Sequence, residues 1–499
     1  MTNTHALTER AVVGVLWTSL AVGMQAFLQL LALIVLARLL TPSQFGVFAA
    51  ALTVIGLISI LSEFGVAAAL VQHPNLDQRH QRVGFTLSLL LSLPVIGLLW
   101  TAAPAIADFF HVAELAPVVQ VASLACIFHG ASLTAEGLAQ RGLRFRWLAA
   151  IDAAAFGVGY TVVGTALAWH GAGVWALVGA HLSQHFVRMV CLLAGQPHPK
   201  RPLLERRAIG ELLYFGGGFT LARIGNYFAG QGDKLVIGHW LGTQTLGLYV
   251  HAYQLMTMPA ILFGQILDRV LFPTMALVQL EPSRLIRAYR SGVAVCALII
   301  FPASLVLALV APELVLVLLG PAWSGVVVPF QILALGMLFR TSYKLSDSVA
   351  RATGAVYRRA WRQAIFALAI VLGALLGQNW GLGGAAVGVV AATALNFALM
   401  AQLSFRLVRM SVIEFGAAHL PALALGILVI APTWALVTWL RDLQVSPLLL
   451  LLDVAIFAPV VGLLLCWCAP SLFVGPDARS LVRILLSVAP ARLQRHLSA

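Results

Sequence analysis

Long apolar stretches follow one another along nearly the whole chain, separated by short polar breaks or breaks that contain Gly and Pro. A helix needs about 20 apolar residues to cross the hydrocarbon of a bilayer. Only 10% of the residues are charged, whereas a soluble domain carries about 25%, so this chain could not cover a water-facing surface. We therefore predict an all-α integral membrane protein of about fourteen transmembrane helices, with runs at 11–38, 46–71, 83–108, 115–139, 147–169, 172–195, 211–239, 246–272, 288–311, 326–350, 360–379, 382–408, 415–440 and 447–470.

Basic residues are unevenly shared between the gaps that separate these runs. With the N-terminus placed in the cytoplasm, 23 of the 31 Lys and Arg residues fall in cytoplasmic segments, and the opposite loops hold only Arg38 and Arg441. Loops rich in Lys and Arg stay on the cytoplasmic side, so we predict that both termini are cytoplasmic. In the basic tail 472–499, Leu485 and other apolar residues alternate with arginines such as Arg483, a pattern typical of a helix lying on the membrane surface. The net charge of +13 does not indicate nucleic-acid binding, because the cations are spread over many gaps.

The chain also resembles itself at two places. Residues 39–48 align with 240–249 at an offset of 201, and residues 139–146 align with 351–358 at an offset of 212. These matches predict two six-helix halves that enter the membrane in the same orientation, because six is even. Two such halves facing each other create a central cavity that opens to one side and then to the other, which favours a transporter over an enzyme. The predicted divisions are the halves 1–200 and 201–410, helices 13 and 14 in 411–471, and the tail 472–499.

Three charged residues share one face of the predicted helix 326–350. Arg340, Lys344 and Asp347 are spaced i, i+4 and i+7. A charge in the centre of a bilayer costs at least about 2.5–3.5 kcal/mol, so such residues face protein or water. We interpret Arg340 and Lys344 as a cationic stripe that receives an anionic head group, with Asp347 as an ion-coupling candidate. The alternative is a salt bridge of Arg340 or Lys344 with Asp347 or with another helix.

The run 211–239 carries a second polar set. Arg223 lies near its middle with Asn226 on the same face, and Asp233 and Lys234 lie near its outer end. Gln25, in the first run, matches Asn226 at the repeat offset of 201. These residues are candidates for a cavity wall that binds substrate, with Asp233 as an ion-coupling candidate. The alternatives are snorkelling of Lys234 to the interface and hydrogen bonding between helices.

Glu63 lies in the apolar run 46–71. A carboxylate in such a position can take up a proton or counter a cation, which makes Glu63 an ion-coupling candidate, and the alternative is a partner for Arg223 or Arg340. His181 and His185 have a metal-binding spacing but no evident third ligand, and all five cysteines fall inside apolar runs. The sequence therefore predicts neither a metal site nor a cofactor.

Several motifs carry a family resemblance, namely ARLLTPSQFG at 37–46, GDKLVIG at 232–238, RVLFP at 269–273 and ATG at 352–354. With them the whole chain resembles the polysaccharide transporter family of the multidrug/oligosaccharidyl-lipid/polysaccharide exporter (MOP) superfamily. The resemblance implies a MATE-like fold and a flippase that moves an undecaprenyl-pyrophosphate-linked oligosaccharide across the bacterial inner membrane. Such lipids feed exopolysaccharide, capsule or lipopolysaccharide assembly, with polymerase or assembly proteins as partners. Coupling to an ion gradient is common in the superfamily.

Two other functions fit the sequence less well. A drug or cation exporter of the same superfamily would favour a cavity dominated by carboxylates, whereas these runs hold more cations. A membrane polysaccharide polymerase or glycosyltransferase generally needs a large external loop with catalytic groups. The longest external gap, at about 312–325, holds Glu313 as its single charge. We therefore expect a transporter and not an enzyme.

Overall fold

The computed structural model describes residues 23–63, 65–73, 75–278 and 281–473, and these residues form helices and their connections, with no strand among them. Within this part of the chain, nine helices are long and apolar enough to cross a membrane, and one bent pair passes the same test together. The prediction of an all-α, multi-pass membrane protein is therefore confirmed. The number of fourteen spans stays a prediction.

The described chain divides into two compact units. The N-terminal unit comprises residues 23–250 together with Ile370–Ala385, and the C-terminal unit comprises residues 251–369 and 386–473. The division predicted at residues 200 and 410 stays a prediction, and the predicted surface helix of the tail falls outside the described residues beyond 473.

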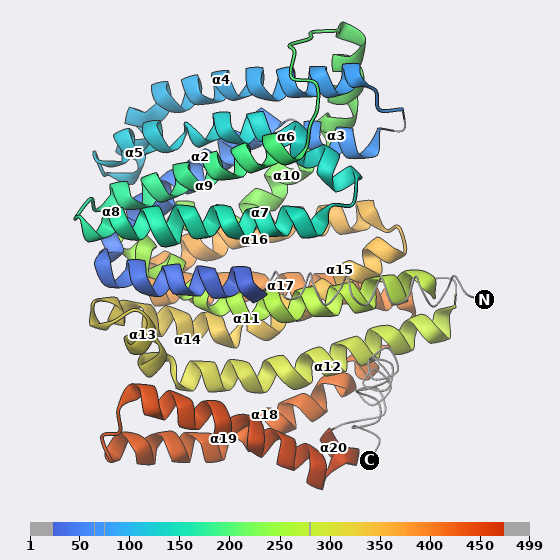
Figure 1. Ribbon diagram of the computed structural model, residues 1–499. Helices are drawn as coiled ribbons and strands as arrows, with labels where there is room; N and C mark the ends of the chain where they lie inside the picture. Colours follow the sequence, from blue (N-terminus) through green and yellow to red (C-terminus); the bar gives the residue numbers. More distant parts are fainter. Residues whose placement is uncertain (1–22, 64, 74, 279–280, 474–499) are drawn as a thin grey trace. The chain divides into compact units, whose positions relative to one another are not determined.

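In the N-terminal unit, α2 occupies a central position, packed against α4, α5, α9 and α10, while α3 packs against α6 and α10 (Figure 1). A π-helical stretch, Gly157–Gly164, joins α7 to α8 and packs on α9. The elements are the helix Gly23–Leu39, α2 (Pro42–Glu63), α3 (Val66–Gln72), α4 (Gln78–Phe110), α5 (Leu115–Ala122), α6 (Ala125–Arg141), α7 (Phe145–Phe156), α8 (Thr165–Trp169), α9 (Val174–Gly195), α10 (Arg206–Trp240) and the beginning of α11 (Gly242–Leu277).

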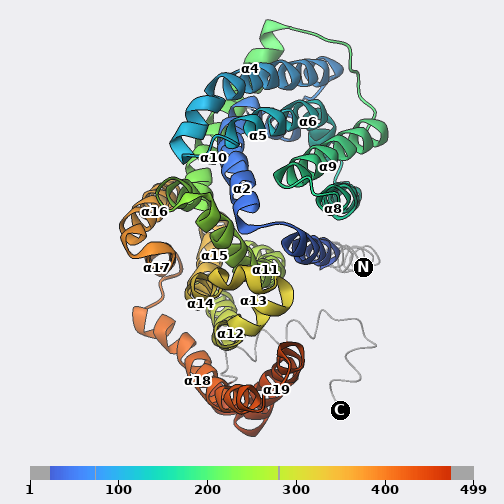
Figure 2. The ribbon, with the colours of Figure 1, turned by 90° about the vertical axis from the view of Figure 1, so that its left-hand side faces the viewer.

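In the C-terminal unit, α12 packs against α14, α15 and α18, and α18 packs against α19, as the view in Figure 2 shows. Large apolar side chains of α18 and α19 are exposed, which suits contact with lipid. The elements are α12 (Pro282–Leu309), α13 (Ala311–Leu318), α14 (Val327–Leu335), α15 (Met337–Ala352), most of α16 (Val356–Gly377) and of α17 (Gly381–Val408), α18 (Val412–Asp442), α19 (Pro447–Cys468) and α20 (Pro470–Phe473).

Two predicted spans are broken where the sequence suggested continuous helices. The run 46–71 is divided between α2 and α3 at Gly65, whose φ of 67° is a left-handed conformation that glycine adopts without steric cost. The run 326–350 bends by 42° between α14 and α15. Glu63 therefore ends α2 at a break, and Arg340 lies in the first turn of α15 instead of mid-helix.

The turn between α16 and α17 belongs to the N-terminal unit. There a Cβ on Gly377 would lie 2.2 Å from the carbonyl oxygen of Gly384, so the two backbones touch directly. Val371 packs against α10, because a Cβ on Gly232 would lie 2.7 Å from its side chain. A hairpin that is late in the sequence thus completes a unit built mostly from early residues.

The two copies of the first repeat motif meet each other inside the N-terminal unit. A Cβ on Gly46 would lie 1.6 Å from the carbonyl oxygen of Thr243, and a Cβ on Gly247 would lie 1.9 Å from that of Pro42. At the offset of 201, Gly46 is equivalent to Gly247 and Pro42 to Thr243. The contact of Gly46 with Thr243 is therefore repeated by the equivalent contact of Gly247 with Pro42. A two-fold relation between the copies produces such reciprocal contacts.

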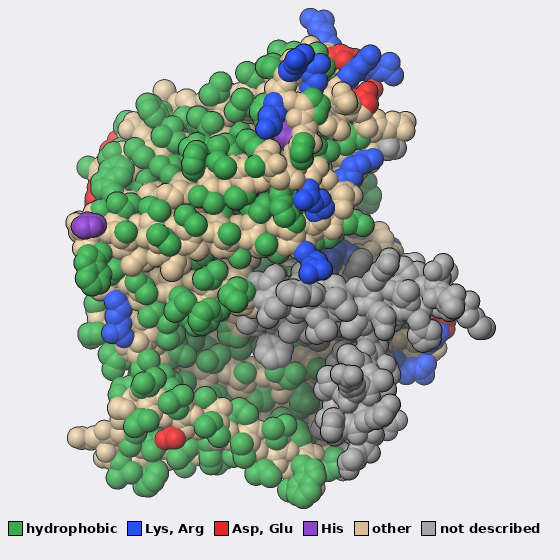
Figure 3. All heavy atoms as spheres, viewed as in Figure 1, with side chains coloured by type: hydrophobic (Ala, Val, Ile, Leu, Met, Phe, Trp, Pro, Cys, Tyr) green, Lys and Arg blue, Asp and Glu red, His purple; other side chains and the backbone are tan. Residues whose placement is uncertain are grey.

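Basic side chains gather at one end of the helices of the N-terminal unit, while hydrophobic side chains cover most of the face drawn in Figure 3. Contacts hold this end together: Arg82 Nε donates to the Arg201 carbonyl (2.9 Å), and Arg144 Nη1 donates to the Gly195 carbonyl (2.8 Å). Asp77, just before α4, accepts a hydrogen bond from the backbone N–H of His80, which lowers the pKa of the Asp77 carboxyl below its usual value.

Candidate functional site

An ion pair joins α2 to α10 in the N-terminal unit. Both guanidinium Nη atoms of Arg223 donate to the carboxylate of Glu63, Nη2 at 3.1 Å from Oε1. The side chain of Glu63 is 15% exposed and that of Arg223 is 37% exposed. The alternative that Glu63 is a partner for Arg223 is therefore confirmed. The bidentate geometry fixes the guanidinium in one orientation.

Histidines from two further helices extend this pair. His129, on α6, places Nε2 at 3.3 Å from Glu63 Oε1. The His185 ring lies 6.3 Å from the His129 ring and 4.5 Å from the His181 ring. Glu63 thus lies between the guanidinium of Arg223 and the imidazole of His129, with His185 and His181 further from the carboxylate. The sequence showed the pair His181 and His185, but not that His129 meets Glu63.

The polar residues toward the far end of α10 lie in different environments. Asp233 is 2% exposed and accepts a hydrogen bond of 2.6 Å from the hydroxyl of Tyr249. Lys234 donates to the side chain of Gln231. Asn226 is exposed, and Gln25 is half-buried on the helix Gly23–Leu39. Their roles in substrate binding stay predictions.

The charged face of α15 lies in the C-terminal unit. Asp347 accepts from Arg351, with Nε 3.1 Å from Oδ2, and from Arg359 of α16. The guanidinium of Arg340 lies over the ring of Tyr253, 4.8 Å from its centroid, a cation–π contact. Arg340 and Lys344 are both half-buried. The part played by Arg359 and Tyr253 was not visible in the sequence, because both come from other helices.

A second ion network, only partly buried, links three helices of the N-terminal unit. Arg188 on α9 donates to Glu136 on α6 (3.0 Å) and to Asp152 on α7 (2.7 Å). Three helices contribute one residue each, so no spacing within a single run could reveal the network. Two carboxylates satisfy one guanidinium here, which favours a structural role.

Three known proteins are similar to this chain in sequence or in fold. The chain is 28% identical over 342 residues to the Escherichia coli lipopolysaccharide biosynthesis protein WzxC, covering 67% of this chain and 68% of that protein. It is 27% identical over 292 residues to the Rhizobium meliloti succinoglycan biosynthesis transport protein ExoT, covering 58% of each. The fold is similar to that of the lipid II flippase MurJ in an inward closed conformation, with a TM-score of 0.75 and 13% identity, over 94% of this chain and 100% of that one.

A family model provides the broader assignment. It is described as polysaccharide biosynthesis protein and matches residues 35–328, more than half of the chain. The matched region includes both copies of the first repeat motif, the Glu63–Arg223 pair and the buried Asp233. The chain therefore belongs to the polysaccharide biosynthesis protein family.

Proposed function

We propose that this protein is a flippase that moves an undecaprenyl-pyrophosphate-linked oligosaccharide across the bacterial inner membrane by alternating access. The lipid would supply exopolysaccharide, lipopolysaccharide or capsule assembly, with a polymerase or other assembly proteins as partners. The membership in the polysaccharide biosynthesis family supports this proposal, and so does the similarity to ExoT, which is named as a transport protein. The single observation that carries the substrate assignment is the cationic face of α15.

The chemistry of that face suits a pyrophosphate. α15 contains three cations, Arg340, Lys344 and Arg351, and one carboxylate, Asp347, so the helix has a surplus of positive charge. An arginine can hold phosphate oxygens through two parallel hydrogen bonds, and a lysine adds a compact point charge. A cation–π contact with the Tyr253 ring helps to position the Arg340 guanidinium. Arg340 and Lys344 are the groups that we assign to the phosphates.

The second part of the proposal concerns ion coupling through Glu63. Protonation of Glu63 would remove the charge that holds Arg223, and His129 Nε2 lies 3.3 Å from the same carboxylate. Asp233 and Asp347 are the other coupling candidates, and their carboxylates already accept from Tyr249 and from two arginines. Purified protein in liposomes should flip the lipid faster with an inward proton gradient than without one. Equal rates would exclude coupling while leaving the flippase proposal standing.

The topology completes the proposal. We place both termini, and the basic end of the N-terminal unit, in the cytoplasm, in line with the excess of Lys and Arg in alternate loops. Fourteen spans would be arranged as two parallel six-helix halves followed by α18 and α19. The reciprocal contact of Gly46 and Gly247 supports such a repeat.

The test is replacement of the α15 cations. Arg340→Ala and Lys344→Ala should each reduce glycan export by about ten-fold or more, because a hydrogen bond to a charged group contributes about 1.5–3 kcal/mol. Arg340→Lys should restore part of the loss, since it keeps the charge without the two-pronged geometry. Arg284→Ala is the matched control, because this cation of α12 is 58% exposed and pairs with its own neighbour Glu281. Normal glycan export from the double variant Arg340→Ala/Lys344→Ala, at a normal protein level, would exclude the assignment of these two residues to the phosphates.

A further inference from the structure

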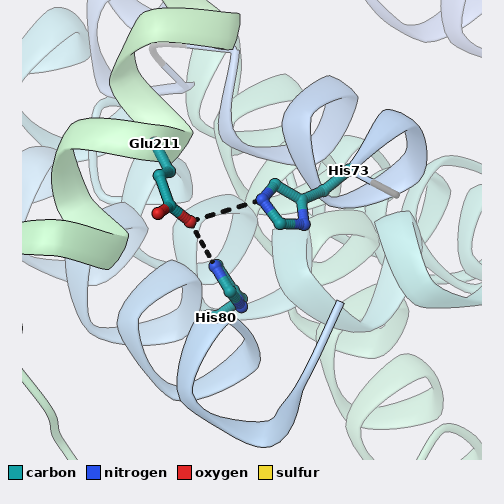
Figure 4. A group of neighbouring side chains, drawn as sticks. All are labelled: His73, His80 and Glu211. Carbon is teal, nitrogen blue, oxygen red and sulfur yellow. Dashed lines mark hydrogen bonds and ion pairs between the residues drawn. The ribbon is translucent and has the colours of Figure 1, made fainter. Parts of the chain in front are cut away.

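Three potential metal ligands converge at the basic end of the N-terminal unit (Figure 4). His73 follows α3, His80 lies in the first turn of α4, and Glu211 lies near the beginning of α10. Glu211 Oε2 lies 2.9 Å from His80 Nε2 and 3.4 Å from His73 Nε2. Both imidazole side chains are about nine-tenths buried, and the carboxylate is 36% exposed. One oxygen atom is therefore shared by two imidazole nitrogens.

Neighbouring side chains hold two of these candidate ligands in place through hydrogen bonds. Asp77 Oδ1 lies 2.7 Å from His80 Nδ1, and Asp77 is itself held because it accepts from the backbone N–H groups of Arg79 and His80. Arg207 Nε donates to the other oxygen of Glu211, Oε1, at 3.1 Å. Metal-binding histidines usually donate their second ring nitrogen to a carboxylate or carbonyl, which fixes the tautomer that leaves Nε2 free to bind.

We infer that His73, His80 and Glu211 bind one Zn²⁺ ion, through the two Nε2 atoms and a carboxylate oxygen. Zinc–ligand bonds of about 2.0–2.1 Å at tetrahedral angles separate neighbouring ligand atoms by about 3.3 Å, close to the separations of 2.9 and 3.4 Å found here. All three candidate ligand atoms lie within 4.8 Å of one another. Three protein ligands leave the fourth tetrahedral position for water, a ligand set that zinc uses in other proteins.

The alternative to a metal ion is a structural arrangement in which both histidines donate to Glu211. A protonated His80 alone would satisfy Asp77 and Glu211, but the ring of His73 lies only 4.3 Å from the ring of His80 and reaches the same carboxylate oxygen. Without a metal ion, the Nε2–H groups of both rings would have to donate to this single oxygen. A metal ion instead uses the lone pairs of both rings, and imidazole with carboxylate is a set that favours zinc over calcium or magnesium.

The position of the ion gives it a mechanical consequence. Arg141, at the end of α6, donates to the carbonyl of His73 at 2.6 Å, so the histidine backbone is already anchored. The ion would tie the beginning of α10 to the connection between α3 and α4. Binding that requires these segments to stay together stabilises the unit that contains them.

The experiment uses purified full-length protein in detergent, stripped with a chelator and then dialysed against Zn²⁺. Wild type should retain one equivalent of zinc by elemental analysis and melt at a higher temperature than the stripped protein. Co²⁺ should give the visible absorption of a tetrahedral site. Glu211→Gln and His73→Gln should bind at least ten-fold more weakly, and Asp77→Asn about 10–100-fold more weakly, as loss of a supporting carboxylate does.

His198→Gln is the matched control, because His198 is a half-buried histidine in the connection between α9 and α10 that hydrogen bonds to the Gln196 carbonyl and not to this cluster. It should bind zinc as wild type does. If Glu211→Gln fails to fold, the comparison of stripped and loaded wild type together with Asp77→Asn decides the matter. Wild type that retains no zinc, or zinc binding that is unchanged in Glu211→Gln or Asp77→Asn, overturns the inference.

Discussion

Replacing Gly46 by Ala tests the close approach of α2 to α11 in the N-terminal unit. The new methyl group would start 1.6 Å from the carbonyl oxygen of Thr243. A carbon and a carbonyl oxygen in favourable contact are about 3.3 Å apart, so the two segments must separate by about 1.7 Å. The obstacle is backbone rather than a side chain that could rotate away. Overpacking costs about 1–3 kcal/mol and more where backbone must move, so we expect a loss of about 3 kcal/mol.

The assay is thermal unfolding in detergent, followed with a dye that reacts with the buried thiol of Cys126, which is 4% exposed. A loss of about 3 kcal/mol in a unit of this size corresponds to a melting temperature about 6–12 °C lower. Gly247→Ala should behave alike, and the double variant should cost less than the sum, because the first substitution already separates the same two segments.

Gly230→Ala is the matched control. This glycine lies within α10, and a Cβ there would meet nothing within 4 Å, so the change should raise stability by up to about 1 kcal/mol through helix propensity. If Gly46→Ala melts together with wild type while being correctly expressed, the close approach of the two motifs is wrong. Additive losses in the double variant would show that the two glycines do not share one contact.

Two further predictions concern buried charges. A double-mutant cycle with Glu63→Gln and Arg223→Gln should give a coupling free energy of at least about 1 kcal/mol. The reason is that the Glu63 carboxylate is largely buried, and removal of either charge leaves the other without its partner. Additive shifts in melting temperature would refute the ion pair. Tyr249→Phe should lower the free energy of unfolding by about 1.5–3 kcal/mol, because the buried carboxylate of Asp233 loses a hydrogen-bond donor. The control Tyr214→Phe, at a residue that is 85% exposed, should leave the melting temperature unchanged.

The sequence alone is sufficient to predict a helical membrane protein and its family, because the first depends on composition and the second on contiguous motifs. Apolar runs also place Arg340 and Lys344 on one helix face. They do not reveal the breaks at Gly65 and Gly336, because an isolated glycine inside an apolar run is equally compatible with a continuous helix.

Contacts between helices are the part that periodicity cannot supply. The pairing of Glu63 with Arg223 was one of two alternatives, and only the packing of α2 on α10 decides it. Glu211 is 131 residues beyond His80, so no local spacing indicates that they meet. Periodicity states which face of a helix is buried, but the neighbour on that face depends on the packing of the whole unit.

The late hairpin tip between α16 and α17 has a consequence for how the chain is made. The chain is synthesised from its N-terminus, so α2 to α10 enter the bilayer long before Val371 and Gly384 have been translated. The surface of α10 around Gly232 therefore stays uncovered until residues 370–385 have been made and pack against it. A nascent chain stalled ahead of residue 370 should expose that surface to insertion chaperones and to proteases, whereas a chain stalled far enough beyond residue 385 for residues 370–385 to have left the ribosome should already protect it.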